Sequence, residues 1–146
     1  MAPETDKERI LIVDDDPNML ELLRRNLSMQ EDKVITASGV TEAIGILDKT
    51  PIDLVITDMK MPGRSGLELI RHVRENCKNA GVMVVTGYAT EAIRAARAGA
   101  EEYLVKPFTE DELFSAVQRV FDKMQIRRAK QTHNACQYVG QGDMGS

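Results

Sequence analysis

The run from Leu54 to Thr57, which ends at Asp58, constrains the fold of this chain more than any other stretch. Four residues that favour strands stop abruptly at a carboxylate, and a Pro62-Gly63 turn follows within a few residues. A continuous apolar run bounded by turn residues is typical of a strand buried on both faces, as in a parallel sheet. Asp58 would then lie at the carboxyl end of this strand, where open α/β sheets place their ligand crevice.

Strand-like and helix-like segments alternate along the whole chain. Short apolar runs rich in β-branched residues lie at 10–13, 33–37, 54–57, 81–85 and 103–105. Helical periodicity follows them at about 17–30, 40–50, 67–76, 92–98 and 109–124. Thr109 and Glu112 have the spacing of a capping box at the start of the last helix. This alternation predicts an α/β fold, with a five-stranded parallel sheet, helices on both of its faces and right-handed crossovers.

Length and composition exclude several classes of protein. The 146 residues fit a single domain, and 42% hydrophobic with 29% charged residues is typical of a soluble globular chain. A net charge of -4 gives no general reason to expect direct nucleic-acid binding. Cys77 and Cys136 form no CxxC pair, which favours a reducing cytoplasm. The first residues lack the apolar core of a signal peptide, and no apolar run approaches the ~20 residues of a membrane span.

Polar residues follow four of the five predicted strands at the point where each ends. Asp14 and Asp15 follow the first strand, Asp58 the third, Thr86 the fourth and Lys106 the fifth. In a doubly wound sheet of strand order 2-1-3-4-5, the first and third strands are neighbours, so the three carboxylates would converge. Clustered carboxylates repel one another unless a cation compensates, and hard oxygen ligands suit Mg²⁺.

Such a cluster favours phosphoryl-transfer chemistry. Mg²⁺ and Lys106 would hold the oxygens of a phosphoryl group beside Asp58. An aspartate carboxylate can act as the nucleophile and form an aspartyl phosphate. Thr86 would add a hydroxyl donor to the phosphoryl oxygens. The sequence therefore predicts a Mg²⁺-dependent phosphoacceptor site.

The motifs at the strand ends, taken together, resemble the signature of the response-regulator receiver domain of two-component signal transduction. They are Val13-Asp14-Asp15-Asp16, Asp58 with Met61-Pro62-Gly63, Thr86-Gly87, and Tyr103-Leu104-Val105-Lys106-Pro107-Phe108. The resemblance covers roughly residues 8–125 in order, and implies a flavodoxin-like (βα)5 three-layer sandwich of strand order 2-1-3-4-5. Residues 126–146 are expected to form a helix extension and a mobile C-terminal tail, because the periodicity fades near Arg127.

The resemblance also implies roles for individual residues. Asp58 would accept a phosphoryl group from a phosphohistidine on a sensor histidine kinase or a phosphotransfer protein. Asp15, Asp58 and the backbone carbonyl of Lys60 would bind Mg²⁺, with Asp14 joining through water. Lys106 would contact the phosphoryl group, and the Lys106-Pro107 peptide would be cis.

The expected switch pair is Thr86 and Tyr103. By the same resemblance, the Thr86 hydroxyl would move toward the phosphoryl group and the Tyr103 ring would turn inward. The partner-binding surface would change, with homodimerisation on phosphorylation as one outcome. Output would be protein interaction, or transcription control through a domain outside these residues. The chain would be a phosphoprotein that dephosphorylates itself. It would not be an enzyme that turns over external substrates.

Other interpretations of the same residues stay open. Asp16 is assigned to capping the first helix, and Asp14 and Asp15 could be caps as well. Lys106 alone could be a surface lysine, and Tyr103 could be half-buried packing. One alternative function is an aspartate-nucleophile phosphatase, for which the loops look too short to build a substrate pocket. Another is a docking module whose phosphorylation site is vestigial, against which the five polar site residues count.

Overall fold

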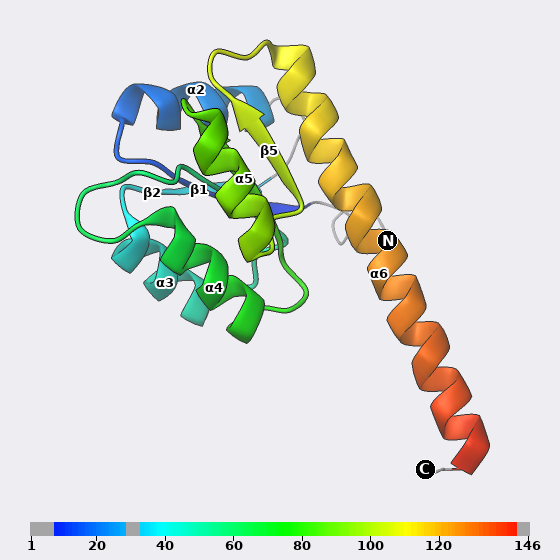
Figure 1. Cartoon of the computed structure of the whole chain (residues 1–146). Coiled ribbons are helices and arrows are strands. Elements are labelled where there is room, and N and C mark those ends of the chain that lie inside the picture. Colours follow the sequence, from blue (N-terminus) through cyan, green and yellow to red (C-terminus); the bar gives the residue numbers. More distant parts are fainter. Residues whose placement is uncertain (1–7, 29–32, 143–146) are drawn as a thin grey trace.

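The computed structural model describes residues 8–28 and 33–142, with side chains described as far as Arg127. Strands and helices alternate along this part of the chain (Figure 1). The elements are β1 (Arg9–Val13), α2 (Pro17–Ser28), β2 (Lys33–Ala37), α3 (Val40–Lys49), β3 (Leu54–Thr57), α4 (Gly66–Asn76), β4 (Gly81–Thr86), α5 (Ala89–Ala98), β5 (Glu102–Val105) and α6 (Glu110–Gly142).

The five strands form one parallel sheet in the order β2-β1-β3-β4-β5. This confirms the fold class and strand order that were expected. In the register of the central pair, Val13 lies opposite Thr57, so the residues that follow β1 and β3 leave the sheet side by side. On the other side of β3, Thr57 lies opposite Val84, two residues before the end of β4. The register therefore brings the predicted site residues to one edge.

Alternation along the strands divides the core between the two faces of the sheet. One face packs against α3, α4 and α5, and its strand residues include Leu11, Val13, Val55, Val82 and Val84. The other face packs against α2 and α6, and its strand residues include Ile10, Ile12, Leu54, Ile56, Met83 and Val85. All of these strand side chains are buried, as expected for a parallel sheet covered on both faces.

The predicted element boundaries hold closely, with small differences. Helix α5 begins at Ala89, ahead of the helical periodicity expected at about 92–98, because the backbone carbonyl of Tyr88 closes the first turn. The capping box is confirmed: the Thr109 amide bonds to Glu112 Oε1, and the Glu112 amide bonds to Thr109 Oγ1. The predicted end of the first helix near residue 30 lies outside the described residues, which carry α2 to Ser28.

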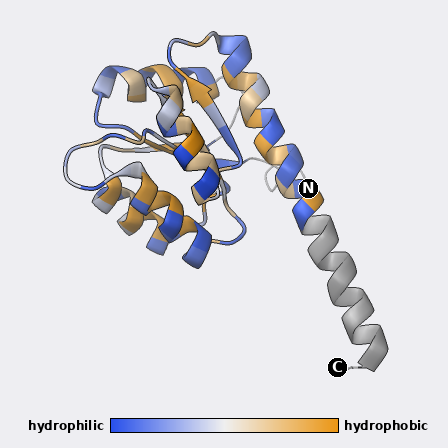
Figure 2. Ribbon diagram, in the orientation of Figure 1, coloured by the Kyte–Doolittle hydropathy of each residue, from blue (hydrophilic) through white to orange (hydrophobic). Residues whose placement is uncertain are grey.

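Helix α6 is longer than the sequence periodicity indicated. It continues to Gly142, well past Arg127, and leaves the sheet as a single extended helix (Figure 1). As far as its side chains are described, hydrophobic and hydrophilic residues alternate along it (Figure 2). The mobility expected for the C-terminal tail stays a prediction. Within the described part of the chain, no helix combines the length and the apolar character needed to cross a bilayer.

Candidate functional site

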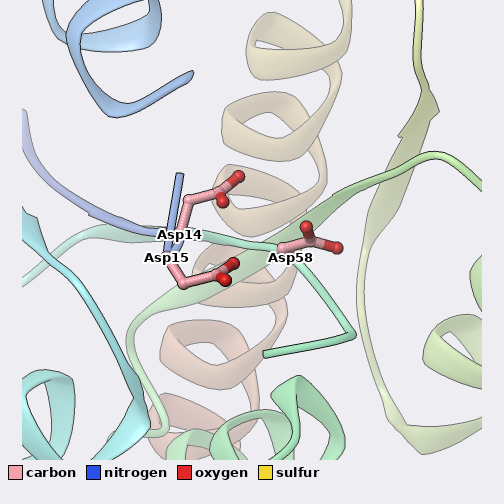
Figure 3. Close-up of side chains that lie close together, drawn as sticks. All are labelled: Asp14, Asp15 and Asp58. Atoms are coloured by element: carbon pink, nitrogen blue, oxygen red, sulfur yellow. The ribbon is translucent and has the colours of Figure 1, made fainter. Parts of the chain in front are cut away.

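Three carboxylates gather at the carboxyl ends of the two central strands. Asp14 and Asp15 follow β1, Asp58 follows β3, and Asp14 and Asp15 point toward the end of β3 (Figure 3). One oxygen atom from each carboxylate lies within 4.8 Å of the others. Asp14 is buried, Asp58 is half-buried and Asp15 is exposed, so the cluster opens to solvent on one side. The convergence predicted from the strand order is confirmed.

Asp14 is held by the start of the first helix. Its Oδ1 accepts a hydrogen bond of 2.9 Å from the backbone N–H of Asp16. The Asp16 carboxylate in turn accepts one of 2.9 Å from the backbone N–H of Asn18, which is the geometry of a helix cap. Asp16 therefore has the capping role assigned to it, and Asp14 faces the site.

Asp58 is oriented by its own loop. Its Oδ1 accepts hydrogen bonds from the backbone N–H groups of Met59 and Lys60, at 2.6 and 3.4 Å. Its Oδ2 lies 3.3 Å from Lys106 Nζ, which comes from the end of β5. One oxygen is thus fixed by the backbone, and the other faces the only cationic side chain that contacts the cluster among the described residues.

Lys106 bridges the two carboxylates that are most enclosed. Its Nζ lies 3.5 Å from Asp14 Oδ2, in addition to the contact with Asp58. Partial burial by itself would lower the pKa of the Lys106 ammonium, but the negative charges of Asp14 and Asp58 outweigh it and raise that pKa. Lys106 is therefore a full cation at neutral pH, and its stabilising contribution would be lost only as the pH rises through this raised pKa. The Lys106-Pro107 peptide is cis, as the resemblance implied.

The environment of Asp14 disfavours its negative charge. Burial raises the pKa of its carboxyl, the Asp16 amide and Lys106 lower it, and the charge of Asp58 raises it, with a net upward shift. A raised pKa means that the folded protein binds this proton more tightly than the unfolded chain does. Asp14 therefore favours the folded state in acid, and this contribution is lost as the pH rises through the pKa of the folded state.

We expect Asp14→Asn to raise the free energy of unfolding of the metal-free protein at neutral pH by about 1 kcal/mol. The amide keeps an oxygen for the Asp16 N–H and removes one of the crowded negative charges. Urea unfolding followed by circular dichroism would measure the gain, which should shrink in acid. The matched control is Asp16→Asn, because asparagine caps helices as well as aspartate does and Asp16 is exposed. Equal effects of the two substitutions would contradict the expectation.

The two predicted switch residues, Thr86 and Tyr103, are not among the residues that form the carboxylate–lysine cluster. Thr86 is buried at the end of β4, and its hydroxyl accepts a hydrogen bond of 3.3 Å from the backbone N–H of Tyr88. Tyr103 lies on β5 opposite Val84, and its side chain is 49% exposed. The structure therefore brings Asp14, Asp15, Asp58 and Lys106 together, while Thr86 is turned toward its own loop and Tyr103 faces outward.

Two features of the site were not foreseen from the sequence. Gly66, at the start of α4, packs directly against the backbone of Asp58 and Met59, where a Cβ atom would have no room. The Lys60 ammonium lies 4.4 Å from the centroid of the Tyr88 ring, so it links the loops after β3 and β4. A glycine at the start of a helix is only a weak indication that another backbone segment packs closely against it. Nothing local in the sequence predicts the cation–π contact.

The chemistry of the donor set suits a hard divalent cation. All three clustered side chains are carboxylates, and Lys106 alone cannot balance their charge. Mg²⁺ takes oxygen ligands and typically uses one or two carboxylates, with the remaining positions filled by water or phosphate. The partial exposure of Asp58 and the exposure of Asp15 leave room for such ligands.

A family model described as the response regulator receiver domain matches residues 10–118. Among curated proteins, the chain is 33% identical over 129 residues to the C4-dicarboxylate transport transcriptional regulatory protein DctD of Pseudomonas aeruginosa, covering 87% of this chain and 27% of DctD. It is 35% identical over 131 residues to the transcriptional regulatory protein ResD of Bacillus subtilis, covering 88% of this chain and 52% of ResD. The chain thus spans only part of these relatives.

Solved structures give the same result. The response regulator protein TrrA of Thermotoga maritima, in complex with Mg(2+)-BeF, matches with a TM-score of 0.72 and 38% identity, covering 77% of this chain and 98% of that chain. A response regulator receiver domain protein from Clostridium thermocellum matches with a TM-score of 0.75 and 34% identity, over 82% and 98% of the two chains. The chain belongs to the response regulator receiver domain family.

Proposed function

We propose that this chain is a phosphorylation-activated signalling switch, in which Asp58 accepts a phosphoryl group from a phosphohistidine of a sensor histidine kinase or phosphotransfer protein. The observation that carries the proposal is the placement of Lys106 Nζ at 3.3 Å from Asp58 and 3.5 Å from Asp14, beside a third carboxylate. This arrangement offers one nucleophilic carboxylate, one fixed cation and further oxygen ligands at a single edge of the sheet.

In the transfer step, Asp58 Oδ2 attacks the phosphorus atom of the donor. A P–O bond forms, the P–N bond to the imidazole breaks, and its electron pair leaves with the imidazole nitrogen. Lys106 neutralises charge on the phosphoryl oxygens, and Asp14 holds Lys106 in place for this task. The backbone N–H groups of Met59 and Lys60 keep the Asp58 carboxylate oriented. Later attack by water would return the carboxylate and release inorganic phosphate.

Asp15, Asp58 and the backbone carbonyl of Lys60 would hold Mg²⁺ at this edge, with Asp14 joining through water. When bound, the cation would neutralise negative charge on the phosphoryl oxygens and on the clustered carboxylates. Lys106 pairs with Asp14 and Asp58, whereas Asp15 contacts no lysine among the residues that the structure describes, and this supports the division of roles.

The phosphorylated state would differ in its partner-binding surface. A phosphoryl group adds up to ~2 negative charges, which is enough to bias a bistable loop. Thr86 and Tyr103 would respond, Thr86 by turning its hydroxyl toward the phosphoryl group and Tyr103 by turning inward. The output surface would consist of α5, β5 and the first part of α6, where Ile93 and Tyr103 are exposed. Homodimerisation through this surface is one form that the output would take.

The proposal is tested by incubation with acetyl phosphate, with Mg²⁺ or with a chelator, followed by intact mass measurement. We expect one phosphate adduct on the wild type with Mg²⁺, and none on Asp58→Asn or without the metal. Absence of an adduct on the wild type would refute the phosphoacceptor function. Rapid consumption of acetyl phosphate without an adduct would indicate a turnover enzyme instead.

A further inference from the structure

The cation–π contact between Lys60 and Tyr88 joins two loops at the site. Lys60 lies two residues after Asp58, and its backbone N–H faces the Asp58 carboxylate at 3.4 Å. Tyr88 lies two residues after Thr86, and its backbone N–H donates to the Thr86 hydroxyl at 3.3 Å. With the Lys60 ammonium 4.4 Å from the Tyr88 ring centroid, a continuous set of contacts runs from Asp58 to Thr86.

Packing does not force this contact. The Tyr88 side chain is 57% exposed, and Lys60 is exposed as well. Lys60 also lines a cleft of about 450 Å³ to which Tyr88 does not contribute, so it borders open space. The contact has the geometry of a cation–π interaction, which is attractive even at an exposed site.

The contact holds a loop whose position matters for Thr86. Tyr88 is the N-cap residue of α5, and its carbonyl accepts hydrogen bonds from the amides of Glu91 and Ala92. The Thr86 hydroxyl accepts its hydrogen bond from the backbone of this same loop. If the Thr86 hydroxyl turns toward a phosphoryl group on Asp58, it gives up this hydrogen bond, and one of the contacts that hold residues 86–88 is lost.

We propose that Lys60 and Tyr88 form a tie that restrains the Thr86 loop in the unphosphorylated protein and thereby opposes occupation of the phosphoryl site. This inference rests on the proposed function, and it makes both side chains positioning residues that act through Thr86. A contact made in only one of two states shifts the equilibrium between them by its own free energy. Breaking the tie should therefore favour the state in which Thr86 faces the phosphoryl group.

The test measures the affinity of the full chain for beryllium fluoride, a phosphoryl stand-in, in saturating Mg²⁺ by isothermal titration calorimetry. We expect Lys60→Met and Tyr88→Leu each to bind it about two- to fivefold more tightly than the wild type, because an exposed cation–π contact is of that strength. The double variant should bind no more tightly than the single variants, since both substitutions break one contact.

Two controls separate the tie from other effects. Tyr88→Phe keeps the ring face and removes only the hydroxyl, so it should bind like the wild type; this excludes a role of the hydroxyl in the effect of Tyr88→Leu. Lys78→Met removes the same charge from an exposed lysine in the loop before β4 and should also leave the affinity unchanged.

The outcomes distinguish the inference from the function on which it rests. If the wild type binds no beryllium fluoride, the proposed phosphoryl site itself fails. If the wild type binds it, the tie is overturned by unchanged or weaker binding in the single variants, by additive effects in the double variant, or by Tyr88→Phe behaving like Tyr88→Leu.

Discussion

Replacing Gly66 by alanine is expected to lower the free energy of unfolding by about 3 kcal/mol and to impair phosphoryl acceptance at Asp58. A Cβ atom on Gly66 would lie 2.1 Å from the backbone oxygen of Asp58 and 2.9 Å from the Cα of Met59. These are backbone atoms, which cannot rotate away as a flexible side chain can. The start of α4 and the Asp58 loop would have to separate, and the hydrogen bond from the Gly66 amide to the Met59 carbonyl would be strained.

Gly45→Ala provides the matched control for this prediction. Gly45 lies within α3, is exposed, and has nothing within 4 Å of the position its Cβ would take. Alanine there should raise stability by about 0.5–1 kcal/mol through helix propensity. Urea unfolding of both variants, together with acetyl phosphate labelling, would measure the contrast. Equal stability of the two variants would show that the backbone contact at Gly66 can relax without cost.

Glu101→Ala is expected to destabilise the fold by about 3 kcal/mol, because it leaves the buried Val82 amide and two partly buried guanidinium groups without their acceptor. The Glu101 side chain is 8% exposed. Its carboxylate accepts hydrogen bonds from the Val82 amide at 2.7 Å and from Arg74 at 2.9 Å, and it also pairs with Arg127. These partners come from β4, α4 and α6, so one carboxylate joins three elements.

The neighbouring Glu102 offers a control of the same chemistry. Glu102 pairs with Lys123 and Arg119 of α6, but these two cations are about half exposed. Glu102→Ala should therefore cost no more than about 1 kcal/mol. Thermal and urea unfolding would compare the two variants, with Glu101→Gln expected between them because it keeps an oxygen for Val82. Similar losses at Glu101 and Glu102 would mean that the enclosed network contributes no more than a surface ion pair.

The strand-end residues could be predicted because parallel strands end at one edge. Asp14, Asp58 and Lys106 each follow an apolar run directly, so the sheet topology alone brings them close. The capping box at Thr109 was predictable for a similar reason, since its partners are three residues apart. Local pattern and sheet order were therefore enough to predict where these residues lie, while their roles stay predictions.

The remaining features depend on contacts between residues far apart in the chain. Arg74 and Arg127 reach Glu101 across separations of 27 and 26 residues, which no local pattern reveals. Gly66 must be a glycine because the backbone of Asp58 lies where a Cβ atom would be. This close approach can be recognised only once the three-dimensional position of the Asp58 loop is known. Helix α6 continues beyond the segment in which the sequence shows helical periodicity. The only local indication of its length was weak: the sequence contains no glycine or proline between Glu110 and Val139.

The length of α6 gives the domain a mechanical property. Its 33 residues form a rod of roughly 50 Å, of which the part beyond Arg127 accounts for roughly 22 Å. Near the midpoint of this rod, Arg127 pairs with Glu101 and Lys123 pairs with Glu102, at the start of β5. A rod fastened there works as a lever: a tilt of ~10° at the fastening would displace its far end by roughly 4 Å. A small change in the orientation of α6 at the sheet would thus become a larger displacement at the far end of the helix, at a distance from Asp58.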